Sequence, residues 1–593
     1  MPRVLFRCLC ILLLLLALAA PVAAETAPKV STFNRYSGYS EAMYDGYSRS
    51  SQYVAARDGT RLAVDIYRPT LQGKVAEEKL PVVWTHHRYQ RASAGKDGKV
   101  EPNLSDWLLE VLKHGYVVAA VDVRGSGASF GVFEGMFSTK ENHDAYDMTE
   151  WFASQPWSNG KTGMYSRSYL GMTQYMAAGQ QPPHLTAIFP EVAGTDWYDL
   201  LYHGGIYHGP FIELWTGIVK ELDVDKPAVP VDEDKDGSLL KAAVEEHKKN
   251  RNAAGLYASL PYRDDVDART GVQVWRDWTP ITYLSQIQES KVAVYNLDGW
   301  YDRYVRDQTI LFRNLDPKLR KLTIGPWTHT QEDHMDFAAE HLRWWDYWLK
   351  GIQNGMMDDA PVHYYVMGAP EATAWRAART WPLPQERRTA YHFGPERSLK
   401  TSAPKSGRGR DSRTVDYSAK IDPDPRWSLE RGFPELSAND AKGISYTTPP
   451  LRKAVEVTGH PMVHLWISSS ATDADLFVYL EEVDRKGRSR YVSEGMLRAS
   501  NRATADPGYD TAGLPYHRGN RADRQPLKPG EPVELVFDLY PTSTLFKAGH
   551  RIRITVTGAD ARNARTPKLN PPPKLTIYRE AGRASYVELP VIP

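Results

Sequence analysis

The chain has 593 residues, and its 73 basic and 72 acidic side chains leave a formal net charge of +1. A nearly neutral chain lacks the basic surface that nucleic-acid binding requires, so we expect no nucleic-acid partner. The two cysteines, Cys8 and Cys10, both lie near the N-terminus, which excludes a disulfide framework, a thiolate metal site and a cysteine nucleophile from the rest of the chain.

Residues 1–24 have the pattern of a secretory signal peptide. Arg3 and Arg7 give a basic start, residues 9–20 are apolar, and Ala24 supplies a small residue for cleavage. We therefore expect cleavage near Ala24 and an extracytoplasmic (periplasmic or secreted) protein, with an uncleaved leader acting as a membrane anchor as the alternative. No later run is apolar and long enough to span a bilayer, so no membrane contact is expected after cleavage.

Short, continuous apolar runs follow the leader. They occur at 82–85, 117–121, 187–189 and 292–297. Runs of this kind are typical of parallel strands covered by helices on both faces, and stretches of helical length lie between them. The pattern predicts an α/β domain in two parts, residues 25–195 and 290–368.

Between residues 196 and 289 the alternation of apolar runs with stretches of helical length is interrupted. Segment 239–250 has helical composition, and its surroundings are rich in Trp, Tyr and His. We interpret residues 196–289 as a helical insertion that caps a site on the sheet.

In residues 369–593 the apolar side chains alternate with polar ones. Val463, Leu465 and Ile467 show this period of two, as do residues 533–539 and 552–556. Period-2 alternation with Gly/Pro turns predicts antiparallel strands, hence an all-β jelly-roll or sandwich domain.

Ser168 occupies the strongest local motif. A short strand enters a turn at Ser168, and the helix-compatible run 169–178 leaves it. A serine at such a corner has its hydroxyl exposed above the sheet and lies beside the N–H groups of a helix N-terminus. The G-x-S-x-G pattern is not matched, because Ser166 and Leu170 replace the two glycines, and a simple N-cap serine is the alternative.

Two later strands end in ionisable residues. The strand 292–297 leads to Asp302, and the strand 322–324 leads to His329. The order Ser168, Asp302, His329 is that of α/β-hydrolases, in which a histidine removes the serine proton and a carboxylate orients the histidine. These three residues therefore form a candidate catalytic triad.

On these motifs the chain resembles the cocaine esterase / Xaa-Pro dipeptidyl-peptidase family of serine hydrolases (the CocE/NonD type). Its characteristic blocks match residues 122–129 (DVRGSGAS), 150–160 (EWFASQPWSNG), 299–302 (GWYD), 325–329 (GPWTH), 458–461 (TGHP) and 546–551 (FKAGHR). The resemblance implies an α/β-hydrolase domain with an inserted helical cap, followed by an all-β jelly-roll domain. It implies Ser168 as nucleophile, Asp302 as orienting carboxylate and His329 as general base, with no cofactor and no metal.

Family members complete the oxyanion hole with a tyrosine hydroxyl after the first long strand. Tyr89 holds that place here, together with the backbone N–H of Tyr169, although the proline that often precedes this tyrosine is absent. Losing one such donor typically costs ~10²–10³ in rate. Another departure is Ser166, where the family usually has glycine.

The charge of the candidate site residues indicates the substrate class. The family cleaves esters or amides, and those substrates with a free ammonium need carboxylates in the site. Tyr304 and Val305 stand where α-amino-acid ester hydrolases have acids, which leaves Asp196 as a single candidate acid. We therefore expect a largely neutral, aromatic acyl pocket. Its candidate residues are Asp196, Trp197, Tyr198, Trp300 and Tyr301.

Three other patterns do not support a site. The glycines of 125–131 are wrongly spaced for a dinucleotide fold. The acidic turn 232–236 has Ala243 where a calcium loop needs a bidentate Glu. His203 and His208 lack a supporting cluster, so we expect cap or pocket residues and not metal ligands.

The sequence therefore predicts a serine hydrolase that cleaves a small-molecule ester or amide through a covalent acyl-enzyme. Two alternatives stay open: an Xaa-Pro dipeptidyl-peptidase and a non-catalytic carbohydrate-binding protein. Whether the chain forms a homo-oligomer is also open.

Overall fold

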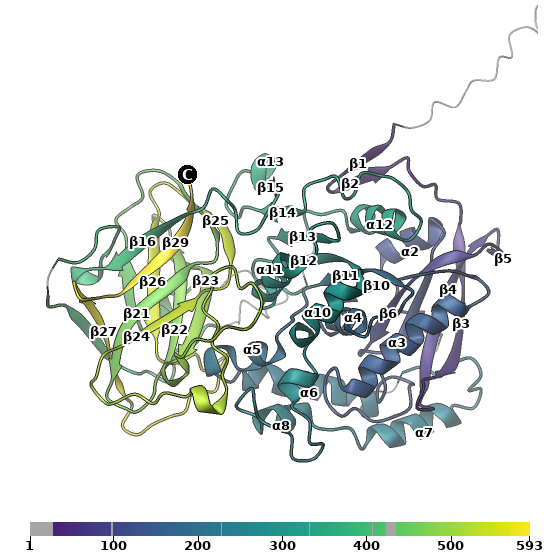
Figure 1. The fold of residues 1–593 in the computed structure, drawn as a ribbon, viewed down its shortest axis with the longest axis horizontal. Helices are drawn as coiled ribbons and strands as arrows, with labels where there is room; N and C mark the ends of the chain where they lie inside the picture. Colours follow the sequence, from purple (N-terminus) through teal and green to yellow (C-terminus); the bar gives the residue numbers. More distant parts are fainter. Residues whose placement is uncertain (1–27, 97–98, 227, 331–332, 406, 423–434) are drawn as a thin grey trace, which may run out of the picture.

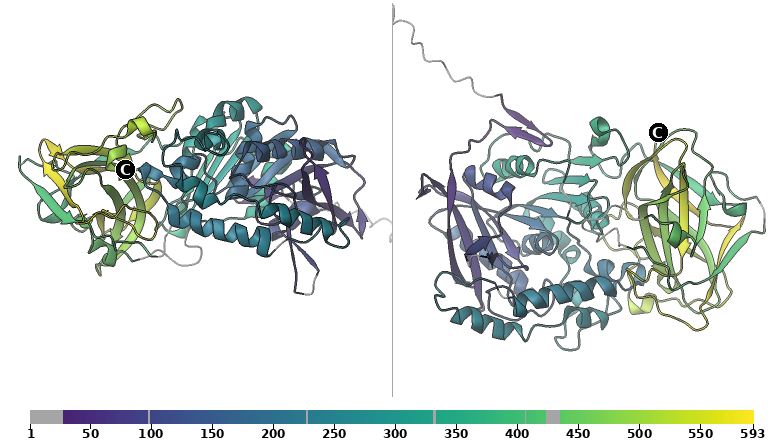
Figure 2. Two further views of the ribbon diagram at one scale, coloured as in Figure 1. Left: turned by 90° about the horizontal axis from the view of Figure 1, so that it is seen from below. Right: turned by 180° about the vertical axis from the view of Figure 1, so that it is seen from behind.

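The computed structural model describes residues 28–593 except 97–98, 227, 331–332, 406 and 423–434. The predicted signal peptide lies outside the described residues. An α/β unit and a β-rich unit lie side by side, with α5 (Trp197–Leu201) between them (Figure 1). The two further views in Figure 2 also show the two units side by side.

The α/β unit is built on one eleven-stranded sheet. Its order is β15-β14-β13-β12-β11-β10-β6-β9-β4-β3, and β5 pairs with β4. The strands are β3 Gly46–Ala55, β4 Arg61–Leu71, β5 Lys74–Val75, β6 Leu80–His87, β9 Val117–Asp122, β10 Ser158–Arg167, β11 Leu185–Glu191, β12 Ala293–Gly299, β13 Arg320–Gly325, β14 Val362–Tyr365 and β15 Trp375–Ala378. In this sheet order, every pair of neighbouring strands from β9 to β14 is parallel. Strands β6, β9 and β12 are buried along their whole length, which explains their continuous apolar sequences.

Helices connect these strands. They are α2 Asp106–Lys113, α3 Thr139–Ser154, α4 Tyr169–Gly179, α11 Val305–Asn314 and α12 Phe337–Trp348. β15 pairs antiparallel with β14, so the first sheet extends beyond the boundary predicted at 368/369. Short strands without a strong apolar pattern, such as β15, give no signal that assigns them to one sheet or the other.

The segment between β11 and β12 is helical. It contains α5, η1 His203–Gly205, α6 Gly209–Lys220, the π-helical turn η2 Glu221–Asp225, α7 Ser238–His247, α8 Ala253–Ala258, α9 Val274–Asp277, η3 Pro280–Tyr283 and α10 Leu284–Ser290. In Figure 1, α6, α7 and α8 run along the lower edge of the α/β unit. This segment is called the cap below.

The β-rich unit consists of two antiparallel sheets. The ten-stranded sheet contains β16 Arg387–Phe393, β17 Leu399–Lys400, β18 Arg410–Thr414, β20 Val455–Gly459, β21 Met462–Ser469, β24 Val533–Asp538, β25 Thr542–Phe546, β27 Lys574–Glu580, β28 Arg583–Ala584 and β29 Tyr586–Ile592. The four-stranded sheet contains β19 Ile444–Thr447, β22 Asp475–Val483, β23 Ser489–Arg498 and β26 Arg551–Thr557. Val463, Leu465 and Ile467 are buried in the core of this unit, which confirms the predicted alternation; the jelly-roll connectivity stays a prediction.

The cap and α11 contact the β-rich unit directly. Arg306 donates to both carboxylate oxygens of Asp538, at 2.7 and 3.2 Å. In η1 the backbone of Gly204 has φ +56°, and a β-carbon there would collide with the backbone of Met496; one at Gly205 would collide with the Asn501 side chain. This close backbone approach requires glycine.

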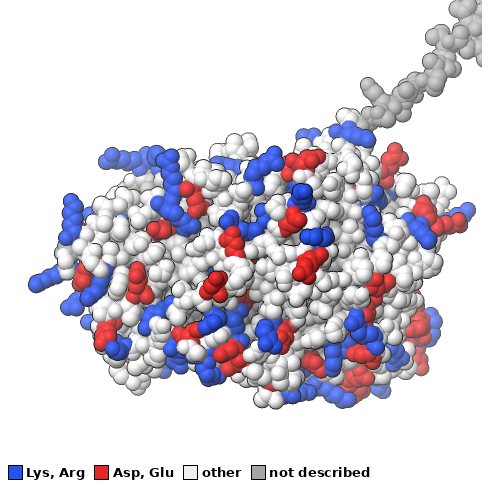
Figure 3. Space-filling model, viewed as in Figure 1, with Lys and Arg blue, Asp and Glu red and all other residues white. Residues whose placement is uncertain are grey.

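The charged surface has no dominant sign on the face in Figure 3, where basic and acidic side chains are interspersed. No helix among the described residues combines the length and the apolar character that crossing a membrane would need.

Candidate active site

Ser168 lies at the corner between β10 and α4 in a strained backbone conformation. Its φ is 58° and its ψ is −127°, and Ser166 also has a positive φ of 112°. The N–H of Ser168 donates to the carbonyl of Glu191 at 2.9 Å, which fixes the corner against β11. The Ser168 hydroxyl makes no capping hydrogen bond to α4, so the N-cap alternative does not describe it. Strain of this kind is typical of functional positions.

Gly171 allows α4 to start close to the sheet. A β-carbon at Gly171 would lie 2.7 Å from the β-carbon of Ala193 and 2.9 Å from the carbonyl oxygen of Glu191. Any side chain here would therefore push the corner away from β11.

Asp302 and His329 follow neighbouring parallel strands, β12 and β13. Two backbone hydrogen bonds join the loops: Trp300 N–H to Gly325 at 2.9 Å and Tyr301 N–H to the carbonyl of Trp327 at 3.0 Å. This pairing brings the two predicted residues together.

The carboxylate of Asp302 is buried and contacts His329. Its Oδ2 lies 2.6 Å from Nδ1 of His329, and its Oδ1 accepts the backbone N–H of Tyr304 at 2.8 Å. An imidazole held at Nδ1 by a carboxylate keeps Nε2 for proton transfer.

Ser168 and His329 open into one cavity of about 180 Å³. Its lining residues are Tyr89, Met136, Ser168, Tyr169, Met172, Trp197, Phe211, Leu214, Trp215, Ile218, Tyr304 and His329. None of them is Asp, Glu, Lys or Arg. The cavity therefore offers aromatic and aliphatic surface around a serine and a histidine.

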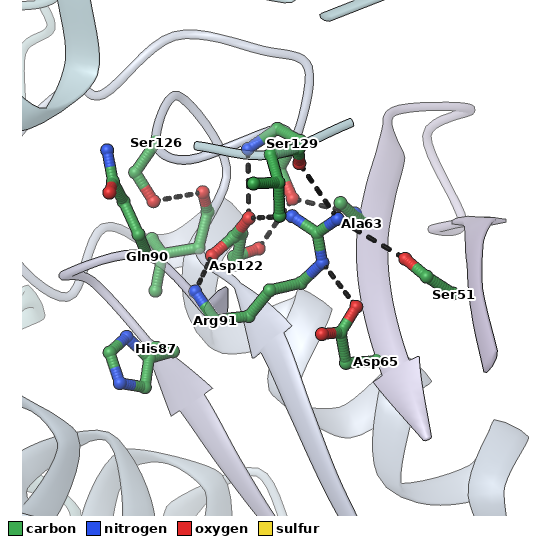
Figure 4. A network of polar contacts seen from close by, with 12 residues as sticks. Ser51, Ala63, Asp65, His87, Gln90, Arg91, Asp122, Ser126 and Ser129 are labelled. Carbon is green, nitrogen blue, oxygen red and sulfur yellow. Dashed lines mark hydrogen bonds and ion pairs between the residues drawn. The ribbon is translucent and has the colours of Figure 1, made fainter. Parts of the chain in front are cut away.

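The loop that carries Tyr89 is anchored to the sheet. Arg91 donates through Nε to Asp65 at 2.7 Å and through Nη1 to Asp122 at 2.8 Å in a buried network (Figure 4). Asp122 also accepts the backbone N–H groups of Arg91 at 2.7 Å and of Ala128 at 2.8 Å. Asp122, the aspartate that begins the 122–129 motif, thus holds the Tyr89 loop in place.

The cap holds the same loop from its other side. Arg88 donates to both carboxylate oxygens of Asp223, at 2.6 and 2.8 Å, and the Gln90 amide donates to the carbonyl of Leu222 at 2.8 Å. With its neighbours fixed, the half-buried Tyr89 lines the cavity.

The Tyr89 hydroxyl accepts a hydrogen bond from the cap and opens into the same cavity as Ser168. The indole N–H of Trp215 donates to it at 2.9 Å. Burial raises the pKa of Tyr89, and the neighbouring Trp215, Arg88 and Ser168 oppose that rise. Tyr89 is therefore a neutral phenol in the same cavity as the serine.

Tyr169 begins α4, so its backbone N–H has no partner within the helix. Its hydroxyl donates to both carboxylate oxygens of Glu141 in α3, at 2.7 and 2.8 Å. Burial raises the pKa of Glu141 from 4.5 to about 8, and Glu141 also accepts the N–H of Phe137 at 3.2 Å. This buried pair fixes the residue that follows Ser168.

The other predicted pocket residues are placed differently. Trp197 lines the cavity, but Asp196 pairs with Arg263 through two 2.8 Å hydrogen bonds and caps α5. Tyr198 donates to the carbonyls of Pro261 (3.1 Å) and Gly519 (3.2 Å) and is absent from the lining.

Trp300 and Tyr301 also lie away from the lining, in a buried apolar cluster shared with the β-rich unit. The Trp300 N–H donates to the carbonyl of Tyr365 at 2.6 Å. Residues next to a catalytic motif in the chain can point to the opposite side of the sheet edge, which the sequence pattern does not reveal.

His203 and His208 each contact a polar side chain through Nδ1, and these partners do not form a metal site. His203 contacts Asp199 at 3.0 Å, and His208 accepts from Arg303 at 2.7 Å. Over the described residues no group of three or more His, Cys, Asp and Glu side chains could hold a metal ion.

Sequence reasoning missed the apolar face of α6. Phe211, Leu214, Trp215 and Ile218 form one wall of the cavity. Their spacing of three and four residues after Pro210, which lies at the helix start, is an amphipathic-helix signal that could have been found. Leu214 is 66% exposed and Ile218 45% exposed, so this wall extends beyond the cavity to the surface.

Comparison with known proteins decides the family. The model of the X-Pro dipeptidyl-peptidase (S15) family matches residues 58–331, and that of the X-Pro dipeptidyl-peptidase C-terminal non-catalytic domain matches residues 354–588. A Mycobacterium bovis protein named as a serine esterase is 34% identical over 93% of this chain and 96% of its own length. The chain belongs to the S15 family of serine hydrolases.

Other proteins and solved structures are similar to nearly the whole chain. A cocaine esterase of Rhodococcus is 27% identical over 93% of this chain and 100% of its own length. A Staphylococcus aureus CocE/NonD family hydrolase superposes with a TM-score of 0.72 at 22% identity, covering 92% of this chain and 94% of that one. An α-amino acid ester hydrolase gives 0.70 at 20% identity, covering 96% and 100%. These solved structures confirm the predicted α/β-hydrolase fold, and the family model of residues 354–588 agrees with a separate C-terminal domain. Family membership confirms the predicted enzyme class over the carbohydrate-binding alternative.

Proposed function

We propose that this S15 family hydrolase cleaves esters of neutral, apolar carboxylic acids through a Ser168–His329–Asp302 triad. The observation that carries the proposal is the Asp302–His329 pair, whose histidine opens with Ser168 into one cavity without charged lining residues. The strained corner at Ser168 supports its role as nucleophile.

The chemistry follows from these positions. Nε2 of His329 removes the hydroxyl proton as Oγ of Ser168 attacks the ester carbonyl, and Asp302 stabilises the imidazolium that forms. The oxyanion accepts hydrogen bonds from the N–H of Tyr169 and the O–H of Tyr89. His329 then protonates the departing alcohol, and water releases the acid by the same route, with His329 as base.

The charge of the cavity favours esters with no ammonium near the scissile bond. A free ammonium in an apolar cavity would need a carboxylate partner, and Asp196 is already paired with Arg263. Xaa-Pro dipeptidyl-peptidase activity is the second candidate, because relatives from Bacillus anthracis (23% identical) and other bacteria are named for it.

The test uses fluorophosphonate labelling with matched variants. Ser168→Ala should abolish labelling and hydrolysis of p-nitrophenyl butyrate, whereas Ser166→Ala should keep both. Retained labelling in Ser168→Ala, lost in Ser166→Ala, would refute the assignment. Faster hydrolysis of Gly-Pro-p-nitroanilide than of the butyrate ester would favour the peptidase.

We also propose that the leader is cleaved near Ala24 and that the enzyme works outside the cytoplasm. The proposal is supported by the arrangement of residues 1–24 alone. N-terminal sequencing of the protein recovered from periplasm and medium tests it, and an intact N-terminus in the membrane fraction would favour the anchor.

A further inference from the structure

The cap supplies the partner of the Tyr89 hydroxyl. Trp215 lies on α6, lines the cavity and donates its indole N–H to Oη of Tyr89 at 2.9 Å. Tyr89 lies on the loop after β6, so this hydrogen bond joins the cap to the α/β unit at the place where the oxyanion would form.

The number of donors at Oη of Tyr89 limits where the phenolic proton can point. An indole N–H can only donate, and a phenol has one proton to donate. Because Trp215 occupies an acceptor position of Oη, the proton of Tyr89 must point to another partner. Tyr89 and Ser168 line the same cavity, so the phenolic proton can point to the place where the scissile carbonyl would lie.

We propose that Trp215 is a positioning residue for the oxyanion hole: its N–H aims the Tyr89 hydroxyl proton at the reacting carbonyl. Donation into Oη also polarises the phenol, which makes its O–H a stronger donor to the developing oxyanion. The inference rests on the proposed function, in which Tyr89 stabilises the oxyanion.

Trp215 is itself held rigidly by both parts of the site. Its ring stacks on Tyr169, with centroids 6.0 Å apart and planes 8° apart. The Arg88 guanidinium lies 5.7 Å from the Trp215 ring, and Arg88 is fixed by its bidentate pair with Asp223. The indole is therefore oriented by Tyr169, which follows Ser168 in the chain, and by Arg88, which precedes Tyr89. In this proposal the oxyanion hole is complete only when α6 packs against the α/β unit.

A simple wall residue would behave differently from a positioning residue. Loss of packing surface in the cavity weakens substrate and transition state alike, which raises KM. Loss of a hydrogen bond that matters only when the oxyanion forms lowers kcat. Trp197 provides the matched control, because it lines the same cavity and does not contact Tyr89 by a hydrogen bond.

The experiment is a double-mutant cycle on p-nitrophenyl butyrate hydrolysis. Trp215→Phe keeps an aromatic ring on Tyr169 and should lower kcat about 10-fold with little change in KM, against ~10²–10³-fold for Tyr89→Phe. The double variant should be no more than about two-fold slower than Tyr89→Phe alone, since the two residues act as one unit. Trp197→Phe should raise KM and leave kcat nearly unchanged.

Two results would overturn the inference: a Trp215→Phe loss that multiplies in full with that of Tyr89→Phe, or a Trp215→Phe effect on KM alone. If Trp215→Phe fails to fold, benzothienylalanine at position 215, in which sulfur replaces the N–H, provides the same test with the ring shape preserved. Activity that survives Ser168→Ala would instead refute the proposed function, so the two failures are distinct.

Discussion

Replacing Glu141 with Gln should change how the stability of the enzyme depends on pH. Glu141 is buried in the first turn of α3 and accepts the Tyr169 hydroxyl at 2.7 and 2.8 Å. Burial raises its pKa from 4.5 to about 8. At neutral pH the folded protein therefore holds a proton on Glu141, whereas the unfolded chain has released it.

The size of the effect follows from this difference in bound protons. Between the two pKa values the folded state binds one proton more, so the free energy of unfolding falls as pH rises, by about 1.4 kcal/mol per pH unit from this group. Gln does not titrate, so the stability of Glu141→Gln relative to the wild type should rise with that slope and level off above about pH 8. An amide facing the N–H of Phe137 adds a constant offset, which leaves the slope unchanged.

Urea unfolding followed by tryptophan fluorescence, at several values between about pH 5.5 and 8.5, measures this slope. Glu110→Gln on α2 is the control. Its hydrogen bond with Lys113 lowers the pKa of Glu110, so it is ionised in both states over this range and its variant should run parallel to the wild type. Parallel curves for Glu141→Gln as well would refute the reasoning.

Gly171→Ala should lower kcat and cost about 1–3 kcal/mol in thermal unfolding, because the new methyl group would lie 2.7 Å from the Ala193 β-carbon; wild-type values for both would contradict this. Arg263→Met should cost about 3–5 kcal/mol by leaving the Asp196 carboxylate buried without its partner, and adding Asp196→Asn should recover most of that loss in the same melts. Leu214→Gln should reduce kcat/KM for an octanoate ester roughly 10-fold while sparing the acetate ester, because only the longer chain reaches the exposed α6 face; an equal loss for both esters would show that the face is not used.

The parts of the site that follow strand ends could be predicted from the sequence. Asp302 and His329 each come five residues after the end of a continuous apolar run, and the carboxyl ends of parallel strands meet at one edge of a sheet. Ser168 was predicted from the same logic, with a helix-compatible run after it. These predictions depend only on local patterns and on the rule that relates parallel strands.

The parts that depend on packing between distant segments could not be predicted. The sequence predicts Tyr198, Trp300 and Tyr301 in the pocket because they are aromatic and close to the site along the chain, yet none of them lines the cavity. Conversely, Trp215 reaches Tyr89 across 126 positions of sequence. The period of an amphipathic helix indicates that one face is buried, but it does not indicate against which partner.

The glycine turn in η1 limits how this protein can change over evolutionary time. Met496 and Asn501 of the β-rich unit fill the space beside Gly204 and Gly205, and the same cap carries Trp215. A β-rich unit recombined from a distant relative would bring a different surface to this turn and displace the cap. The two parts that separate family models recognise are therefore expected to be inherited together, and functional hybrid enzymes should take the cap and the β-rich unit from the same parent.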